Sequence, residues 1–364
     1  MRQLGVAPRP PVQATPPARI LQAGCDRLTL APSSGEQEDE VPMSTEENTA
    51  AERRFTEEVW NKRLSPEQTV RDLELPGDLK TAEVNGARFA YREQGTGQPV
   101  IFVHGAISDL TIWQQQLPAV GARFRAIAYS RRYAWPNEDL PRGEKDTMGP
   151  HVEDLLGFLS ALDAHPAHLV GNSLGAYICL RAAIREPLAV RSLVLEEPPL
   201  VPLITGTPPA LGRTLASLVR HPLVTLAIII AFWKVRQLGR MIRTADVDSS
   251  VLLFARTALG DEALERLPEQ VRVHILANAS SLLGGMLAGF EPISEAEIRS
   301  IRAPALVVTG AQSPPFHRRL ADLLGTLLPD SQRLDVPSST HFMHLQNPAA
   351  LNSGLLRFLT DLNT

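Results

Sequence analysis

A five-residue segment at positions 171–175, Gly-Asn-Ser-Leu-Gly, constrains the fold of this chain more than any other feature. Residues 167–170 before it, Ala-His-Leu-Val, are typical of a strand, and residues 176–184 after it are typical of a helix. Glycines two positions before and after Ser173 keep side chains away from a tight turn. The segment therefore predicts a strand, a sharp turn and a helix, with the Ser173 hydroxyl at the carboxyl edge of a sheet.

Short apolar runs of the same kind recur along the chain and predict the rest of the sheet. Uninterrupted runs suit strands that are buried on both faces of a parallel sheet. The run at 99–103 is of this kind, similar runs recur at 124–129, 190–195 and 305–308, and a further strand-like stretch lies at 332–336. Amphipathic stretches such as 151–162 and 318–328 separate them. This alternation predicts an α/β fold with a doubly wound, mostly parallel sheet.

Residues from about 200 to 300 keep helical periodicity but contain no apolar run of the strand kind. We interpret them as an inserted helical lid. Within this region residues 222–233 are strongly apolar and are flanked by Arg220, His221 and Lys234. About 12 residues are too few to span a membrane, which takes roughly 18 or more, so we expect no integral membrane span. A helix buried over the sheet or lining an apolar pocket, and one associated with a membrane surface, both stay open.

The first 79 residues are expected to form a disordered or loosely ordered extension, ahead of one domain at residues 80–364. Residues 1–35 carry six prolines, four arginines and one acid, and lack an apolar run of the signal-peptide type. The prolines oppose the amphipathic helix of an organelle transit peptide. Translation could also begin at Met43, which the sequence leaves open. Residues 82–91 then read as two short strands around an Asn-Gly turn.

Composition argues against several functional classes. The 364 residues have a formal net charge of −4, so no general basic field favours nucleic acid. His341 and His344 are close in sequence, but no neighbouring ligand set completes a metal site. We expect no metal, no cofactor and a small-molecule substrate. The two cysteines are compatible with a reducing compartment, and we expect a cytoplasmic protein. The sequence does not predict an oligomeric state.

Ser173 and His341 are the candidate nucleophile and general base. A serine hydroxyl is a weak nucleophile until a neighbouring base takes its proton. His341 follows the strand-like residues 332–336 and precedes a helical stretch at 348–362. His344, three residues further on, is expected to give packing or hydrogen-bonding support.

A second turn supplies candidate donors for an anion. The sequence His104-Gly105-Ala106 ends the apolar run at 99–103. The backbone N–H groups of Ala106 and Leu174 are expected to form an oxyanion hole, two fixed donors aimed at the charge of a tetrahedral intermediate. The helix after Ser173 adds favourable electrostatics through its N-terminus.

Three segments resemble the α/β-hydrolase superfamily, and the resemblance covers roughly residues 80–364. They are Phe-Val-His-Gly at 102–105, the segment at 171–175, and Thr-His-Phe-Met-His-Leu-Gln-Asn-Pro at 340–348. The resemblance implies a serine hydrolase whose histidine comes last in chain order, as His341 does. Many members carry Asp-x-Arg-Gly where this chain has Ser-Arg-Arg-Tyr at 130–133, so Arg131 and Arg132 receive no role.

The acid of the implied Ser-His-acid triad departs from the common pattern of this superfamily. Members usually place it about three residues after a glycine that follows the strand at 305–308, where this chain has Ser313. The haloalkane dehalogenases instead place a glutamate at the end of the preceding core strand. That resemblance implies Glu197, with Glu196 in reserve, although both could be hinge carboxylates paired with arginines. Dehalogenation is disfavoured, because those enzymes attack with an aspartate where this chain has Ser173.

Together these features predict a serine hydrolase that cleaves a small or medium apolar ester or lactone through an acyl-enzyme intermediate. The Leu, Ile, Ala and Phe content of the lid favours an apolar pocket. One alternative is carbon–carbon bond hydrolysis of a vinylogous diketone, which the same motifs resemble. Another is a ligand-binding homologue without catalysis, which the missing acid at Ser313 would favour.

Overall fold

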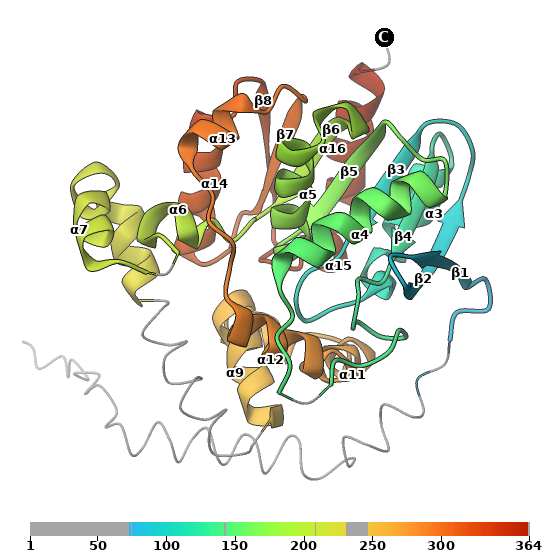
Figure 1. The fold of residues 1–364 in the computed structure, drawn as a ribbon, viewed down its shortest axis with the longest axis horizontal. Helices are drawn as coiled ribbons and strands as arrows, with labels where there is room; N and C mark the ends of the chain where they lie inside the picture. The colour runs from blue at the N-terminus through green and yellow to red at the C-terminus, as the bar shows by residue number, and fades with distance from the viewer. Residues whose placement is uncertain (1–72, 74, 142, 208, 231–246, 363–364) are drawn as a thin grey trace, which may run out of the picture. The chain divides into compact units, whose positions relative to one another are not determined.

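The computed structural model describes residues 73, 75–141, 143–207, 209–230 and 247–362 (Figure 1). Of residues 247–250 it describes the backbone alone. The predicted extension at residues 1–79, the alternative start at Met43 and the end of the apolar run at 222–233 therefore lie largely outside the described residues. The division of the chain at residue 80 stays a prediction.

An eight-stranded sheet forms the centre of the described residues, with strands in the order β1-β2-β4-β3-β5-β6-β7-β8. Strands from β4 onward in this order pair in parallel, whereas β1 and β2 join the edge antiparallel. The strands are β1 Lys80–Val84, β2 Ala87–Gln94, β3 Pro99–Val103, β4 Arg125–Tyr129, β5 Ala167–Asn172, β6 Val190–Glu196, β7 Ala305–Gly310 and β8 Ser331–Val336. The predicted doubly wound, mostly parallel sheet is confirmed.

The alternation of side chains along the central strands divides the core into two layers. Ile101 and Val103 of β3 face a cluster that includes apolar side chains of α4, α5 and α14. Val100 and Phe102, which point the other way, pack with α3 and α16. These helices are α3 Gln116–Gly121, α4 Met148–Ala161, α5 Leu174–Arg185, α14 Pro315–Leu327 and α16 Pro348–Asp361. Both faces are covered, which explains why the central strands consist mainly of apolar residues.

The described residues between β6 and β7 form helices and their connections, and none of them between Glu196 and Ala305 lies in a strand. The elements are α6 Val201–Thr205, α7 Leu211–Arg220, helical residues 222–230, α9 Val247–Leu259, α10 Asp261–Glu265, α11 Glu269–Ala277, α12 Ala279–Ala288 and α13 Glu295–Ser300. A separate apolar cluster joins α9, α11 and α12 to Ile107 and Phe342. The helical content of this insertion agrees with the sequence pattern, and its action as a lid stays a prediction.

Because several of these helices are apolar, their length decides whether one of them could cross a membrane. Among the described helices no single one is long and apolar enough to cross a membrane. The pair α11 and α12, bent by 50° where they meet, passes such a test together on length and composition alone.

Candidate active site

Ser173 stands on a strained turn between β5 and α5. Its backbone has φ of 51° and ψ of −117°, a conformation that residues other than glycine seldom adopt. The flanking glycines allow the close packing that this turn needs. A Cβ added to Gly171 would lie 2.6 Å from the backbone of Ala176, and one added to Gly175 would lie 2.1 Å from the carbonyl oxygen of Val103. The structure therefore has the predicted strand–turn–helix arrangement, with Ser173 partly accessible at its tip.

The turn after β3 lies against this serine. A Cβ placed on Gly105 would come within 3.3 Å of the Ser173 Cβ. Ala106 follows Gly105, and Leu174 follows Ser173 as the first residue of α5. Neither of these two backbone amides donates a hydrogen bond to any residue that the structure describes. The two predicted oxyanion donors thus lie close together, and neither has a hydrogen-bond acceptor among the described residues.

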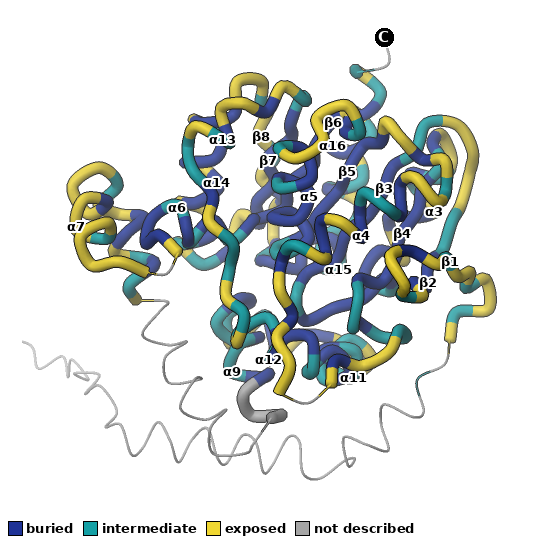
Figure 2. Tube along the Cα trace, in the orientation of Figure 1, coloured by how far each residue is buried: buried dark blue, intermediate teal, exposed yellow. Residues whose placement is uncertain are grey.

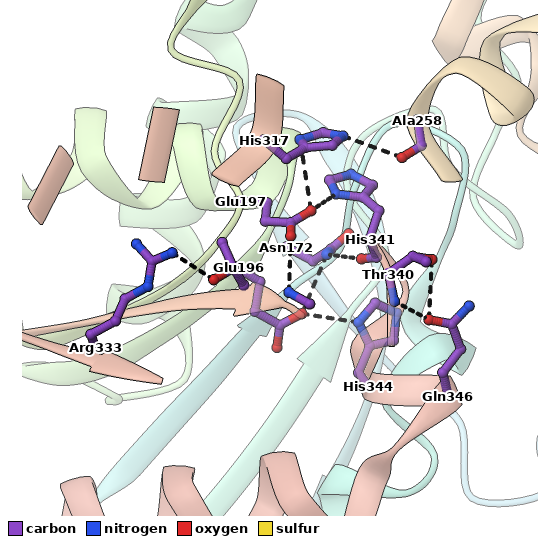
Figure 3. A network of polar contacts seen from close by, with 12 residues as sticks. Asn172, Glu196, Glu197, Ala258, His317, Arg333, Thr340, His341, His344 and Gln346 are labelled. Carbon is purple, nitrogen blue, oxygen red and sulfur yellow. Dashed lines mark hydrogen bonds and ion pairs between the residues drawn. The ribbon is translucent and has the colours of Figure 1, made fainter. Parts of the chain in front are cut away.

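His341 is joined to Glu197 by a short hydrogen bond. Its Nδ1 lies 2.6 Å from Glu197 Oε2, and both side chains are almost fully buried (Figure 3). Because a carboxylate accepts, we assign the proton to Nδ1 of His341, which leaves Nε2 as the basic nitrogen. Two hydrogen bonds hold the backbone of the loop that carries His341. The Thr340 amide donates to Gln346 Oε1 at 2.6 Å, and the His341 carbonyl accepts from Asn172 Nδ2 at 3.1 Å.

Glu197 reaches His341 from the residue just after β6. Its φ of 47° is strained for a glutamate and turns the chain away from the strand. Its other oxygen, Oε1, accepts from the Gly310 amide at the end of β7, at 3.0 Å. Ser313, which holds the commoner acid position, is buried three residues after that glycine. The carboxylate of Glu197, which follows the neighbouring strand β6, therefore lies at the end of β7. The commoner acid position there holds Ser313, which has no carboxylate.

The charge on Glu197 is stabilised despite its burial. Burial alone would raise the pKa of this carboxyl, but the hydrogen bond that His341 donates lowers its pKa below the ordinary value. Glu197 is therefore ionised at neutral pH. An ionised acid beside Nδ1 favours the tautomer in which Nε2 of His341 is free to accept a proton.

Glu196 belongs to a different set of contacts. Its Oε2 lies 3.0 Å from His344 Nδ1 and accepts from Asn172 Nδ2 at 3.3 Å (Figure 3). The expected hydrogen-bonding role of His344 is confirmed by the first of these contacts. Neither glutamate pairs with an arginine among the described residues, contrary to the hinge alternative. The two adjacent carboxylates thus serve two different histidines.

His317 is a third imidazole beside Glu197 that the sequence interpretation did not single out. It lies in the first turn of α14, with Nδ1 at 3.7 Å from Glu197 Oε2. Its ring stacks on that of His341, with centroids 4.1 Å apart and planes inclined by 18°. Its Nε2 donates to the Ala258 carbonyl of α9 at 3.2 Å. Burial and the neighbouring His341 lower the pKa of His317 to about 3, so the ring is neutral at pH 7.

The spacing of these three side chains also raises the question of a metal ion. Glu197, His317 and His341 each offer a ligand atom within 4.8 Å of the other two. Imidazole lone pairs lie in the ring plane, and two stacked rings cannot direct theirs to one ion. Nδ1 of His341 is in addition engaged by Glu197. The arrangement fits a hydrogen-bonded acid and histidine better than a metal centre.

Arg131, which had no assigned role, supports the turn after β3. The guanidinium is buried and donates to the carbonyl oxygens of His104 at 3.2 Å and Gly105 at 2.9 Å. The Arg131 amide donates to His104 Nε2 at 2.8 Å. Arg132 instead pairs with Asp154 on α4 through two contacts of 2.6 and 2.7 Å. Arg131 therefore positions the backbone that leads into Ala106.

Sequence reasoning missed His317 and Arg131 for different reasons. His317 follows Ser313 by four residues, but nothing in a local pattern shows that the first turn of α14 meets Glu197. Arg131 was visible as one of two adjacent arginines in a turn. The signal in the sequence was the residue type itself. Arginine has five N–H donors, so a buried guanidinium must contact several acceptors.

Apolar side chains of the helical insertion border this site. Ile107, next to Ala106, and Phe342, next to His341, pack in one cluster with Val251 and Leu259 of α9. Two cavities of about 300 Å³ each lie elsewhere, one between α7 and α13 and the other beside Gln98 and Phe124, and neither lining includes Ser173.

Comparisons with known proteins agree with this fold. Residues 98–348 match a family model described as alpha/beta hydrolase fold. A putative non-heme bromoperoxidase from Mycobacterium tuberculosis is 26% identical over 298 residues, which cover 75% of this chain and 98% of that protein. A 2-hydroxymuconate semialdehyde hydrolase from Pseudomonas sp. is 33% identical over 120 residues, 30% of this chain and 40% of that one. The structure of carboxylesterase CesB from Bacillus subtilis has a TM-score of 0.60 and 18% identity, covering 85% of this chain and 98% of CesB.

Proposed function

This chain belongs to the α/β-hydrolase fold family and is an α/β-fold hydrolase, and from that premise we propose that it is a serine hydrolase of apolar esters or lactones. The observation that carries the proposal is the 2.6 Å contact between His341 Nδ1 and Glu197 Oε2. It gives the predicted base a buried, ionised partner, which a protein that only binds a ligand at this site does not need.

In the proposed mechanism Ser173 Oγ attacks the carbonyl carbon while Nε2 of His341 takes the hydroxyl proton. The amides of Ala106 and Leu174 hold the resulting oxyanion. Collapse of this intermediate breaks the bond to the leaving alcohol, which receives the proton from His341. Water then attacks the acyl-enzyme with His341 again as base, and releases the acid and free Ser173.

The apolar nature of the substrate is inferred from the side chains beside these groups. Ile107 and Phe342 flank the proposed oxyanion donor and the proposed base, and both pack into the apolar cluster formed with α9, α11 and α12. An apolar acyl or alcohol group would bury its surface against such side chains, whereas a charged one would lose its hydration without a partner.

Carbon–carbon bond hydrolysis is the second candidate, because the chain resembles the 2-hydroxymuconate semialdehyde hydrolase over part of its length. A panel of aryl esters, aliphatic esters, lactones and a vinylogous diketone, each assayed with the wild type and Ser173→Ala, tests both. We expect turnover of esters or lactones that the variant loses. Diketone cleavage without ester turnover would support the second candidate, and failure of a fluorophosphonate probe to label Ser173 would argue against both.

A further inference from the structure

The imidazole of His317, in the first turn of α14, has no role in the proposed mechanism but lies flat against the proposed base. Its ring stacks on that of His341, with centroids 4.1 Å apart and planes inclined by 18°. Strand β7, which precedes α14, is buried along its whole length, and His317 is buried as well (Figure 2). The ring of His317 therefore closes one face of the His341 ring.

A hydrogen bond decides which nitrogen of His317 carries the proton. Nε2 lies 3.2 Å from the carbonyl oxygen of Ala258, which belongs to α9 of the helical insertion (Figure 3). A carbonyl oxygen only accepts, so the proton is on Nε2 and Nδ1 has a lone pair. Burial lowers the pKa of His317 to about 3, so Nδ1 takes up no second proton at neutral pH.

This tautomer leaves Glu197 to His341. Nδ1 of His317 lies 3.7 Å from Glu197 Oε2, the same oxygen that lies 2.6 Å from His341 Nδ1. Nδ1 of His317 is buried and has no hydrogen-bond partner among the described residues. In the other tautomer His317 would direct an N–H group at this oxygen and compete with His341. The Ala258 carbonyl thus favours the form of His317 that does not compete.

We propose that His317 is a positioning residue of the hydrolase, which holds the His341 ring by stacking and is itself held by the Ala258 carbonyl. This inference rests on the proposed function, because it assigns to His317 the orientation of the proposed base. Rotation of the His341 ring would move its Nε2 away from Ser173, and a misplacement of about 1 Å can lower a rate about a hundredfold. The helical insertion then contributes to the geometry of the base through α9.

Steady-state kinetics of three variants with the best ester of the wild type test this proposal. His317→Ala should lower kcat by about ten- to hundredfold and change KM by less than about twofold, because the base is misplaced while substrate binding is kept. His317→Phe, which restores a flat ring without the Nε2 donor, should recover most of this loss. His317→Gln, which restores a donor without a ring, should not. His168→Gln is the control for loss of a buried imidazole, since His168 lies at the start of β5, and it should keep kcat.

Proton NMR adds a measurement that needs no substrate. The proton in the short hydrogen bond between His341 and Glu197 should resonate at low field and be lost from that region in Glu197→Gln. It should persist in His317→Phe and broaden in His317→Ala and His317→Gln, where water reaches the uncovered ring. Circular dichroism shows which variants are folded, and the comparison of His317→Phe with His317→Gln decides alone if His317→Ala is not.

Wild-type kcat and an unchanged low-field proton in folded His317→Ala would overturn the proposal. Equal losses in all three variants, or a loss confined to KM, would overturn it as well. Absence of ester turnover by the wild type would instead contradict the proposed function, and the NMR comparison would still test whether His317 holds His341.

Discussion

Ser173 keeps a backbone conformation that costs free energy, with φ of 51°, because the turn presents its side chain at the end of β5. Such strain is tolerated where the surrounding structure holds it, and here the close approach of α5 to β3 does so. The residue itself can therefore be altered with little effect on the fold.

Ser173→Ala should lower hydrolysis by at least about a thousandfold and leave the melting temperature nearly unchanged. The variant keeps the turn and loses only the nucleophilic oxygen. Turnover of an aryl ester by purified protein, with circular dichroism on the same sample, measures both. Near-normal activity would remove Ser173 from the proposed mechanism.

Glu197→Gln should lower turnover by roughly three to four orders of magnitude, because the amide no longer stabilises a protonated His341 or its working tautomer. Glu196→Gln is the matched control one residue away, and it should cost far less, since Glu196 contacts His344 and Asn172 instead. Ser313→Ala should change turnover very little, because the Ser313 hydroxyl carries no charge. If Glu196→Gln loses turnover while Glu197→Gln stays active, Glu196 and not Glu197 is the acid.

At the scale of secondary structure, the site depends on how closely the N-terminus of α5 approaches the end of β3. A Cβ on Gly175 would lie 2.1 Å from the Val103 carbonyl oxygen and 2.6 Å from that of His104. Both atoms belong to the backbone, so relief requires movement of the strand end or of the helix. Either movement would separate Leu174 from the turn that carries Ala106.

Gly175→Ala should therefore reduce both activity and the free energy of unfolding, by an overpacking cost of about 1–3 kcal/mol. Gly212→Ala is the control, because nothing lies within 4 Å of a Cβ at that helical position. It should stabilise the protein slightly, by about 0.5–1 kcal/mol, through the higher helix propensity of alanine. Urea unfolding and ester turnover of both variants provide the comparison; equal stability for the two would show that the α5 contact can relax.

For the whole molecule, buried histidines couple stability to pH. Burial lowers the pKa values of His104 and His151, and it lowers the pKa of His168 to about 4 and that of His317 to about 3. The unfolded chain takes up protons near the ordinary histidine pKa of about 6.5, whereas these folded side chains stay neutral. The unfolded state then binds more protons, so stability decreases as the pH falls.

We expect the melting temperature to decrease steadily from about pH 6.5 toward pH 4. His168→Gln should flatten this dependence, since one depressed histidine is removed while an amide remains beside Ser192 and Gln98. Differential scanning calorimetry across this pH range measures the slope for both proteins. An unchanged slope in His168→Gln would show that His168 takes up its proton without unfolding.

The order of strands and helices, and the turn that carries Ser173, could be predicted from the sequence because their determinants are local. Alternating apolar runs and helical periods reflect burial within each segment, and glycines at 171 and 175 reflect the space at one turn. The assignments of His341 and of an acid at Glu197 or Glu196 rested in addition on the resemblance to the α/β-hydrolase superfamily, whose members place these groups after strands of the sheet.

Other features were decided only by contacts between segments far apart in the chain. Glu196 and Glu197 are adjacent and chemically alike, and the choice between them depends on the φ of 47° that turns Glu197 toward the ends of β7 and β8. The contact of His317 with Glu197 depends on where α14 begins relative to β6. The period of α7 shows an apolar side, but only its packing through Ser217 shows that this side faces outward. A sequence specifies which side of a helix is apolar, and the neighbouring elements determine what that side meets.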